Sequence, residues 1–270
     1  MSSQNSKHTQ IRKNTMQTLG KHINPWSAVA TLGFCLSAFS LSASVQAQSA
    51  VELQALESQL NAIGTRIERQ QDLSEVEILQ HAYGYYVDKS LWYSLADLWQ
   101  QDGTLEIGGR GVFLGKERVF EYMNVGLGKV GPKPGLLVDH QQFQPLVTIN
   151  PDGNTAEARA IAFVMSNGGW GHNYYENDYV KEDGVWKFSK LHGPFNMYSS
   201  YKIGWVDDTI LNTFPEKFNP PPDLPPSVIY LAYPNYYVEP FHYPNPVTGN
   251  PMPPPDPAAG GAAYGRYKAQ

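Results

Sequence analysis

Cysteine is almost absent from this sequence. Cys35 is the only cysteine among 270 residues, so the fold cannot depend on an internal disulfide and must rely on a packed core. Charge is also sparse, since 17% of the residues are charged and the net charge is −5. Because binding to a phosphate backbone needs a basic surface, this balance argues against nucleic acid as a partner.

The first 47 residues contain no Asp or Glu. Residues 1–24 are polar and basic, residues 28–41 are apolar, and Val45 and Ala47 place small side chains at a cleavage site. This layout predicts a signal peptide over residues 1–47 and an exported protein, periplasmic or secreted, without stable membrane insertion after cleavage. The alternative is an uncleaved anchor, although the apolar run is short for a membrane span. Cleavage would remove Cys35 and exclude a cysteine nucleophile.

Helical patterns come first along the chain. Apolar residues at spacings of three and four predict an N-terminal helix over residues 48–73. Ser74 and Glu77 have the spacing of a capping box, which predicts that a second helix begins at residue 75 and ends near residue 89. A short third helix is expected over residues 91–99.

Strand patterns follow after residue 102 and are interrupted by one helical pattern over residues 116–127. The expected strands cover residues 104–107, 111–114, 136–149, 155–166, 173–181 and 185–191. Helices followed by a meander of strands predict an α+β fold with an antiparallel sheet.

Proline dominates the C-terminal segment. Fifteen of the 21 prolines lie between Pro215 and Pro257, and tyrosines and asparagines are interspersed. Such a segment cannot form central strands, and its many rings favour an extended arm that lies on the domain or on a neighbouring subunit. We therefore expect a folded domain over residues 74–205 and a Pro/Tyr-rich arm over residues 206–270.

Three stretches resemble the nuclear transport factor 2-like superfamily in its SnoaL-like branch. They are residues 86–92 (YVDKSLW), 102–109 (DGTLEIGG) and 178–188 (DYVKEDGVWKF). The resemblance implies a cone in which a curved antiparallel sheet, closed by N-terminal helices, surrounds an apolar cavity. Dimers and trimers both occur among proteins of this resemblance, so a homo-oligomer is expected.

Within that superfamily the sequence is similar to the scytalone dehydratase family. The similarity implies a catalytic aspartate at Asp88, a catalytic histidine at His140 and a polar substrate-binding pair at Asn173 and Tyr175. That family's second catalytic histidine has no counterpart, because residues 165–167 read MSN.

The residue types suit proton transfer. A carboxylate at the rim of an apolar cavity has a raised pKa and becomes a useful base, and it can orient an imidazole that moves a proton. Asp88 and His140 would form such a pair, with Tyr86 as a third catalytic residue that positions oxygens. The alternative is that Asp88 caps its helix and His140 is a core histidine. The remaining expected substrate-binding residues are Tyr85, Trp92 and His192.

No cofactor motif or serine nucleophile is found, and no metal site is expected. His172 lies near Glu176 and Asp178 on one strand face, but strand neighbours two apart diverge too far for a compact set of ligands. We therefore expect a cofactor-independent lyase acting on an aromatic or polyphenolic small molecule, by dehydration or by elimination of a small fragment. The alternatives are a ketosteroid-isomerase-like enzyme and a non-catalytic binding protein.

Overall fold

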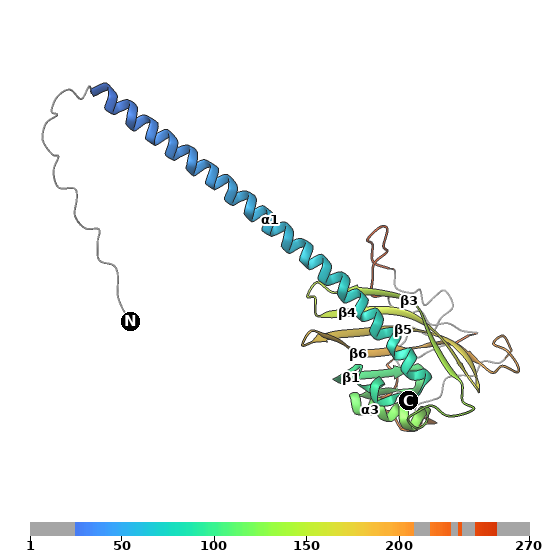
Figure 1. Ribbon diagram of the computed structural model, residues 1–270. Coiled ribbons are helices and arrows are strands. Elements are labelled where there is room, and N and C mark those ends of the chain that lie inside the picture. The colour runs from blue at the N-terminus through green and yellow to red at the C-terminus, as the bar shows by residue number, and fades with distance from the viewer. Residues whose placement is uncertain (1–24, 208–216, 228–231, 234–240, 253–270) are drawn as a thin grey trace, which may run out of the picture. The chain divides into compact units, whose positions relative to one another are not determined.

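The computed structural model describes residues 25–207, 217–227, 232–233 and 241–252, with side chains from residue 48 onward (Figure 1). The chain divides into two units, residues 1–63 and residues 64–270. In the part of the chain that the structure describes, no helix is both long and apolar enough to cross a membrane. Residues 1–24 of the predicted signal peptide lie outside the described residues.

Helix α1 (Pro25–Asp88) is one continuous helix, so the predicted helix start at residue 75 is wrong. The side chains of Gln71 and Glu75 are hydrogen-bonded across the expected boundary (Nε2 to Oε1, 2.7 Å), as neighbours one turn apart in a helix. No proline or glycine separates the two predicted helices between residues 65 and 83. Ser74 and Glu77 therefore lie within α1.

One seven-stranded sheet follows in the described chain. Its strands are β1 (Trp99–Ile107), β2 (Val112–Leu114), β3 (Val138–Ile149), β4 (Thr155–Ser166), β5 (Gly169–Glu182), β6 (Val185–Gly193) and β7 (Phe195–Ser199). The strand order is β2-β1-β6-β5-β4-β3, and β7 pairs with β5. All pairs are antiparallel except β1 with β6, which is parallel. The predicted α+β class with a mostly antiparallel sheet is confirmed.

Short helices connect these strands. Helix α2 (Trp92–Ala96) ends before the expected position because Trp99 already begins β1. The helical pattern at residues 116–127 divides into α3 (Lys116–Glu121) and a π-helical turn (Tyr122–Leu127). A single 3-10 turn follows β1 at Gly108–Arg110. Strand β7 was not predicted, because it is short and directly follows a proline.

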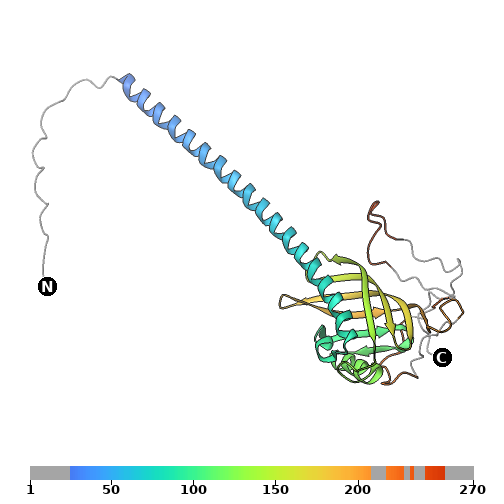
Figure 2. The ribbon, with the colours of Figure 1, turned by 45° about the vertical axis from the view of Figure 1, so that its right-hand side comes forward.

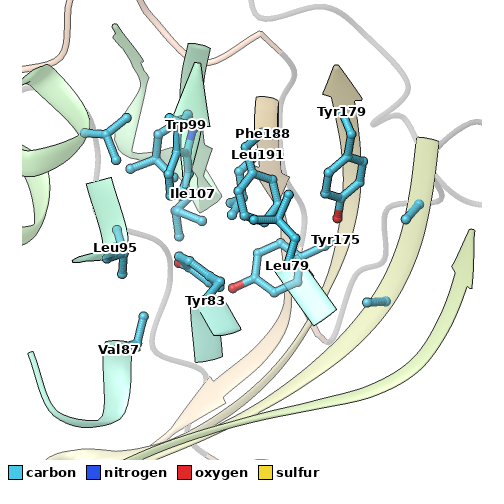
Figure 3. Packing of buried hydrophobic residues seen from close by; sticks show 14 of the residues in the cluster. Leu79, Tyr83, Val87, Leu95, Trp99, Ile107, Tyr175, Tyr179, Phe188 and Leu191 are labelled. Atoms are coloured by element: carbon cyan, nitrogen blue, oxygen red, sulfur yellow. The ribbon is translucent and has the colours of Figure 1, made fainter. Parts of the chain in front are cut away.

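The last turns of α1 pack on the curved sheet (Figure 2). Alternate residues of β4 on this face are alanines, which leave room for the helix and the aromatic rings of its neighbours: Ala156, Ala158, Ala160 and Ala162, each at most 1% exposed. Figure 3 shows Leu79 and Tyr83 of α1 near Tyr175 of β5, in one cluster with Phe188 of β6. This packing is the core of the domain and forms one wall of the cavity described below.

Described parts of the C-terminal segment contact the domain. Leu224 forms a β-bridge with Val112, and Asp223 forms a salt bridge with Arg118. The Phe218 ring stacks on the buried Tyr122 ring, with ring centroids 4.9 Å apart. The segment at residues 217–227 thus lies against β2, α3 and the π-helical turn. The remainder of the predicted arm lies largely outside the described residues.

Candidate active site

A cavity of about 410 Å³ lies between the end of α1, the π-helical turn and the sheet. Aromatic and aliphatic side chains form most of its wall, and a few polar groups converge on it. The lining residues are Tyr83, Val87, Ser90, Trp92, Ile107, Arg110, Tyr122, Leu127, Leu136, Val138, His140, Val164, Ser166, Asn173, Tyr175, Phe195 and Tyr198. A mostly apolar pocket with a few polar groups is the usual form of a small-molecule site.

Three polar side chains form one array in this cavity. The hydroxyl of Tyr175 lies 3.0 Å from Nε2 of His140. The Tyr83 ring packs edge-on against both, with centroids 5.4 Å from that of His140 and 5.9 Å from that of Tyr175, and Figure 3 shows the Tyr175 hydroxyl pointing toward Tyr83. All three residues are buried. The array joins α1, β3 and β5, so the fold brings together residues that are far apart in sequence.

A chain of amides fixes which nitrogen of His140 carries the proton. It begins at the backbone N–H of His192, which can only donate and which donates to Asn177 Oδ1 (3.0 Å). Asn177 therefore donates from Nδ2 to Gln80 Oε1 (2.7 Å). Gln80 donates from Nε2 to Gln142 Oε1 (2.7 Å). Gln142 donates from Nε2 to His140 Nδ1 (2.8 Å), so that this ring nitrogen is an acceptor.

We call Asn177, Gln80 and Gln142 the amide relay. Because Nδ1 of His140 accepts a hydrogen bond from this relay, neutral His140 carries its proton on Nε2. That Nε2–H donates to the hydroxyl oxygen of Tyr175. The proton of Tyr175 is then directed toward Tyr83 or toward a bound molecule. The array is therefore built to donate hydrogen bonds into the cavity.

Burial keeps this array neutral. Loss of solvation lowers the pKa of His140 from 6.5 to about 4. Loss of solvation also raises the pKa of Tyr83 and of Tyr175 above the ordinary value for a phenol. At neutral pH the three groups are thus an imidazole and two phenols, all able to donate a proton in a hydrogen bond.

The expected pair between a carboxylate and the imidazole ring does not form. Asp88 Oδ1 instead accepts the backbone N–H of His140 at 2.6 Å, while both ring nitrogens bond to other residues. The carboxylate of Asp88 therefore fastens the end of α1 to β3. Burial raises its pKa, but Asp88 is not among the residues that line the cavity.

The other predicted site residues divide between the cavity wall and positions outside it. His140, Asn173, Tyr175 and Trp92 line the cavity, and Trp92 also donates from Nε1 to the carbonyl of Gly128 (2.7 Å). The residues outside the lining are Tyr85, Tyr86 and His192.

Each residue outside the lining has another position in the fold. Tyr85 is 71% exposed, because it lies on the solvent face of α1. Tyr86 packs against the core. The ring of His192 lies 3.9 Å from Glu106, and burial lowers its pKa to about 3. The expectation that His192 reaches the cavity mouth does not hold in this geometry.

Sequence reasoning missed six polar residues of the cavity: Tyr83, Ser90, Arg110, Tyr122, Ser166 and Tyr198. Tyr83 shares the helix face of Leu79 and Val87, which are buried in the core. Arg110 follows two glycines, and Tyr122 lies in a segment predicted only as a helix. One feature of the sequence could have indicated that Tyr83 belongs to the site. It is a tyrosine on an otherwise aliphatic helix face, and a buried phenol needs a hydrogen-bond partner.

A close approach at Gly193 makes room for Tyr175. A Cβ atom added at Gly193 would lie 2.5 Å from Cε1 of Tyr175 and 2.8 Å from Cδ1 of Ile107. Both distances are too short for carbon atoms, so any larger residue would push the Tyr175 ring out of position. Glycine at the end of β6 therefore helps to position the hydroxyl of Tyr175.

The described residues contain no group of three or more His, Cys, Asp or Glu side chains that could hold a metal ion. His172, the histidine weighed for such a site, instead bonds through Nδ1 with the amide of Asn196 (2.9 Å).

Comparison with solved structures gives matches over about half of the chain. A candidate scytalone dehydratase from Novosphingobium aromaticivorans is 16% identical and matches 55% of this chain and 99% of its own, with a TM-score of 0.42. A hexachlorocyclohexane dehydrochlorinase from Novosphingobium barchaimii is 21% identical and matches 51% of this chain and 94% of its own, with a TM-score of 0.44. No curated protein sequence matches the chain.

The family comparison covers the sheet and the helix that packs on it. Residues 68–192 match the model of the SnoaL-like domain family. The matched segment begins in the last turns of α1 and ends in β6, so it includes Tyr83, His140 and Tyr175. The chain therefore carries a SnoaL-like domain of the nuclear transport factor 2-like superfamily.

Proposed function

We propose that this protein is a cofactor-independent lyase that removes water, or a comparable small group, from an aromatic or polyphenolic small molecule. The observation that carries the proposal is the array of Tyr83, Tyr175 and His140 in a cavity with aromatic walls. A substrate oxygen that becomes negative in such a cavity is stabilised by donors that are already in place.

The hydrogen bonds of the array run in one direction, toward the substrate oxygen that becomes negative. His140 donates to the hydroxyl of Tyr175, which withdraws electron density from that oxygen and makes its own proton a stronger hydrogen-bond donor. That proton, or the proton of Tyr83, is donated to a substrate carbonyl or phenol oxygen. As the substrate loses a proton, negative charge collects on this oxygen and an enolate or phenolate forms.

The elimination then balances without a cofactor. A water molecule accepts the proton that the substrate loses. The anion then expels a hydroxyl group on the neighbouring carbon, and this hydroxyl takes up that proton and leaves as water. No oxidant or reductant is consumed. The rings of Trp92, Tyr122 and Phe195 offer faces on which an aromatic substrate can stack during this step.

A non-catalytic binding protein is the second candidate, and one observation favours it. No Asp or Glu is found among the residues that line the cavity. The wall of the cavity thus offers hydrogen-bond donors and a cation but no carboxylate base. Such a base would have to lie at the rim of the cavity, where Asp88 stands in the sequence between the lining residues Val87 and Ser90.

Mass-change screening tests the proposed function. The full-length protein is incubated with a panel of phenolic alcohols and aromatic β-hydroxy ketones, and the products are followed by mass spectrometry. Loss of water or of a small fragment is the expected result. An unchanged mass with a shifted absorption spectrum would indicate an isomerase instead, and binding without turnover would indicate a binding protein.

Substitution Tyr175→Phe tests the mechanism. Removing one donor to a developing oxyanion lowers kcat about 100-fold, while the buried ring is retained. Tyr85→Phe is the matched control, because it removes a phenol hydroxyl from an exposed position of α1 outside the cavity. Full activity in Tyr175→Phe would contradict the proposed role of the array.

A further inference from the structure

A cation lines the cavity without a carboxylate partner. Arg110 lies in the 3-10 turn after β1, and its Nη1 donates to the hydroxyl of Tyr122. No described Asp or Glu forms a salt bridge with it. Arg118 and Arg159, by contrast, are paired with Asp223 and Glu176. Arg110 therefore differs from arginines of the same domain whose charge is neutralised within the fold.

Aromatic rings surround the guanidinium of Arg110. Its Cζ atom lies 5.1 Å from the ring centroid of Phe218, 5.7 Å from that of Phe195 and 5.9 Å from that of Tyr122. The ring faces compensate part of the solvation that the charge loses on burial. They also hold the guanidinium at the cavity wall, so that it meets a ligand already in position. An anion in the cavity would supply the missing charge.

Tyr122 adds a second donor beside the guanidinium. Its hydroxyl accepts an N–H of Arg110 and makes no other hydrogen bond in the described chain. The hydroxyl proton is therefore available to a ligand. Burial raises the pKa of Tyr122, so the phenol keeps this proton at neutral pH. The remaining N–H groups of Arg110 and the O–H of Tyr122 together suit the two oxygens of a carboxylate.

An unpartnered acceptor lies in the same cavity. Asn173 is 2% exposed, and its Oδ1 is buried without any hydrogen-bond partner. In the sheet, Asn173 pairs with Phe195, whose ring lies under Arg110. A buried carbonyl oxygen without a donor costs free energy, which a ligand hydroxyl would recover.

We propose that Arg110 and Tyr122 bind the carboxylate of the substrate and that Asn173 accepts a hydroxyl group of the same molecule. The substrate class is then a hydroxylated aromatic carboxylic acid. This inference rests on the proposed function and narrows it, since the array of Tyr83, Tyr175 and His140 would act on the part of the ligand away from its carboxylate.

Titration calorimetry with two matched probes tests the inference. The full-length protein is titrated with 4-hydroxycinnamate and with 4-hydroxycinnamamide, which differ in the charge of one group. The carboxylate is expected to bind about tenfold more tightly or better, because a hydrogen-bonded charge pair in a desolvated site adds that much affinity. Equal affinities, or binding of neither probe, would overturn the proposal.

Variants assign the preference to Arg110. Arg110→Gln is expected to remove the preference for the carboxylate, because it lowers the affinity for the carboxylate far more than the affinity for the amide. Arg110→Lys keeps the charge and retains part of the preference. Arg118→Gln is the matched control, since its guanidinium is paired with Asp223 outside the cavity lining. A preference that survives in Arg110→Gln, even with a lowered Tm, would show that Arg110 only anchors Phe218.

The two proposals fail separately. Conversion of neutral phenols by a protein with no preference for the carboxylate would leave the lyase intact and overturn the anion site. A carboxylate preference that depends on Arg110, in a protein that converts no substrate, would support the anion site and contradict the lyase.

Discussion

At the scale of single residues, the role of His140 is set by partners that the chain places far away. Asp88, the expected partner of its ring, bonds to its backbone instead. The ring nitrogens bond to Gln142 and Tyr175. With its proton fixed on Nε2, His140 acts as a hydrogen-bond donor to Tyr175. The pairing of its ring with the Asp88 carboxylate, expected from the sequence, would instead have made His140 a base.

Removing the last amide of the relay tests this assignment. Gln142→Leu leaves Nδ1 of His140 buried without a donor, which costs about 1–3 kcal/mol of unfolding free energy. The ring is then free to adopt either tautomer, and nitrogen chemical shifts of the histidine side chain report the change. In the native protein we expect the proton on Nε2 alone.

Gln141→Leu is the control for this experiment. Gln141 is the exposed neighbour of Gln142 on β3, and its amide bonds only to Asp139 (2.9 Å). Both the stability and the histidine shifts should stay close to those of the native protein. A native His140 protonated on Nδ1 would contradict the direction of the relay.

At the scale of elements, the sheet provides the space that the site needs. Alanines on β4 let α1 approach the sheet, and the end of β6 leaves room for the ring of Tyr175. Strand β5 is long enough to pair with β6 over Asp178–Glu182 and with β7 over Trp170–Asn173. This division places Tyr175 between the two partner strands, on the face toward the cavity.

The end of β6 is expected to tolerate no side chain. Gly193→Ala would force the new Cβ against the Tyr175 ring and the Ile107 side chain, which costs about 1–3 kcal/mol and shifts Tyr175. We expect a lowered Tm together with weaker ligand binding. Gly168→Ala in the β4–β5 turn is the control, because its Cβ would come no closer than 4.0 Å to Ser166 Oγ. Equal stability of the two variants would disprove the packing argument.

At the scale of the whole molecule, the C-terminal segment supports residues of the cavity wall. Phe218 stacks on Tyr122 and lies beside Arg110, while Asp223 fastens the segment to Arg118. Residues 19 and 24 positions after the end of β7 thus hold groups that line the cavity. The N-terminal leader, the export and the homo-oligomer expected from the sequence stay predictions.

Two buried histidines make stability depend on pH. The pKa values of His140 and His192 are lowered to about 4 and about 3, against 6.5 in an unfolded chain. Below pH 6.5 the unfolded chain gains protons that the native protein excludes, so stability falls as pH falls toward 4. Each histidine contributes about 2 kcal/mol of loss between pH 8 and pH 5. The raised pKa of Asp88 acts in the opposite sense.

Urea unfolding at the two pH values measures this loss. His140→Gln should reduce the loss of unfolding free energy between pH 8 and pH 5 by about half, because the glutamine does not titrate. Equal unfolding free energies of the native protein at pH 8 and pH 5 would show that the histidines are not held neutral by burial.

Local patterns in the sequence determined most of the fold. Alternation placed Asn173 and Tyr175 on the same side of a strand, and both are buried at the cavity. The strands at residues 155–166 and 173–181 were predicted from the same signal, which depends only on neighbours within a few residues. The resemblance to the SnoaL-like branch pointed to His140, which lines the cavity.

Only the tertiary structure decided how the site works. Hydrogen bonds of the amide relay join residues up to about a hundred positions apart, as between Gln80 and Asn177, and no local pattern reports such a pairing. The same is true of Arg110, whose setting depends on rings from β7 and from the C-terminal segment. The sequence indicated which strand residues are buried, because burial on a strand follows the alternation of its side chains. The partners of each buried polar group, and with them its protonation, depend on packing between distant segments.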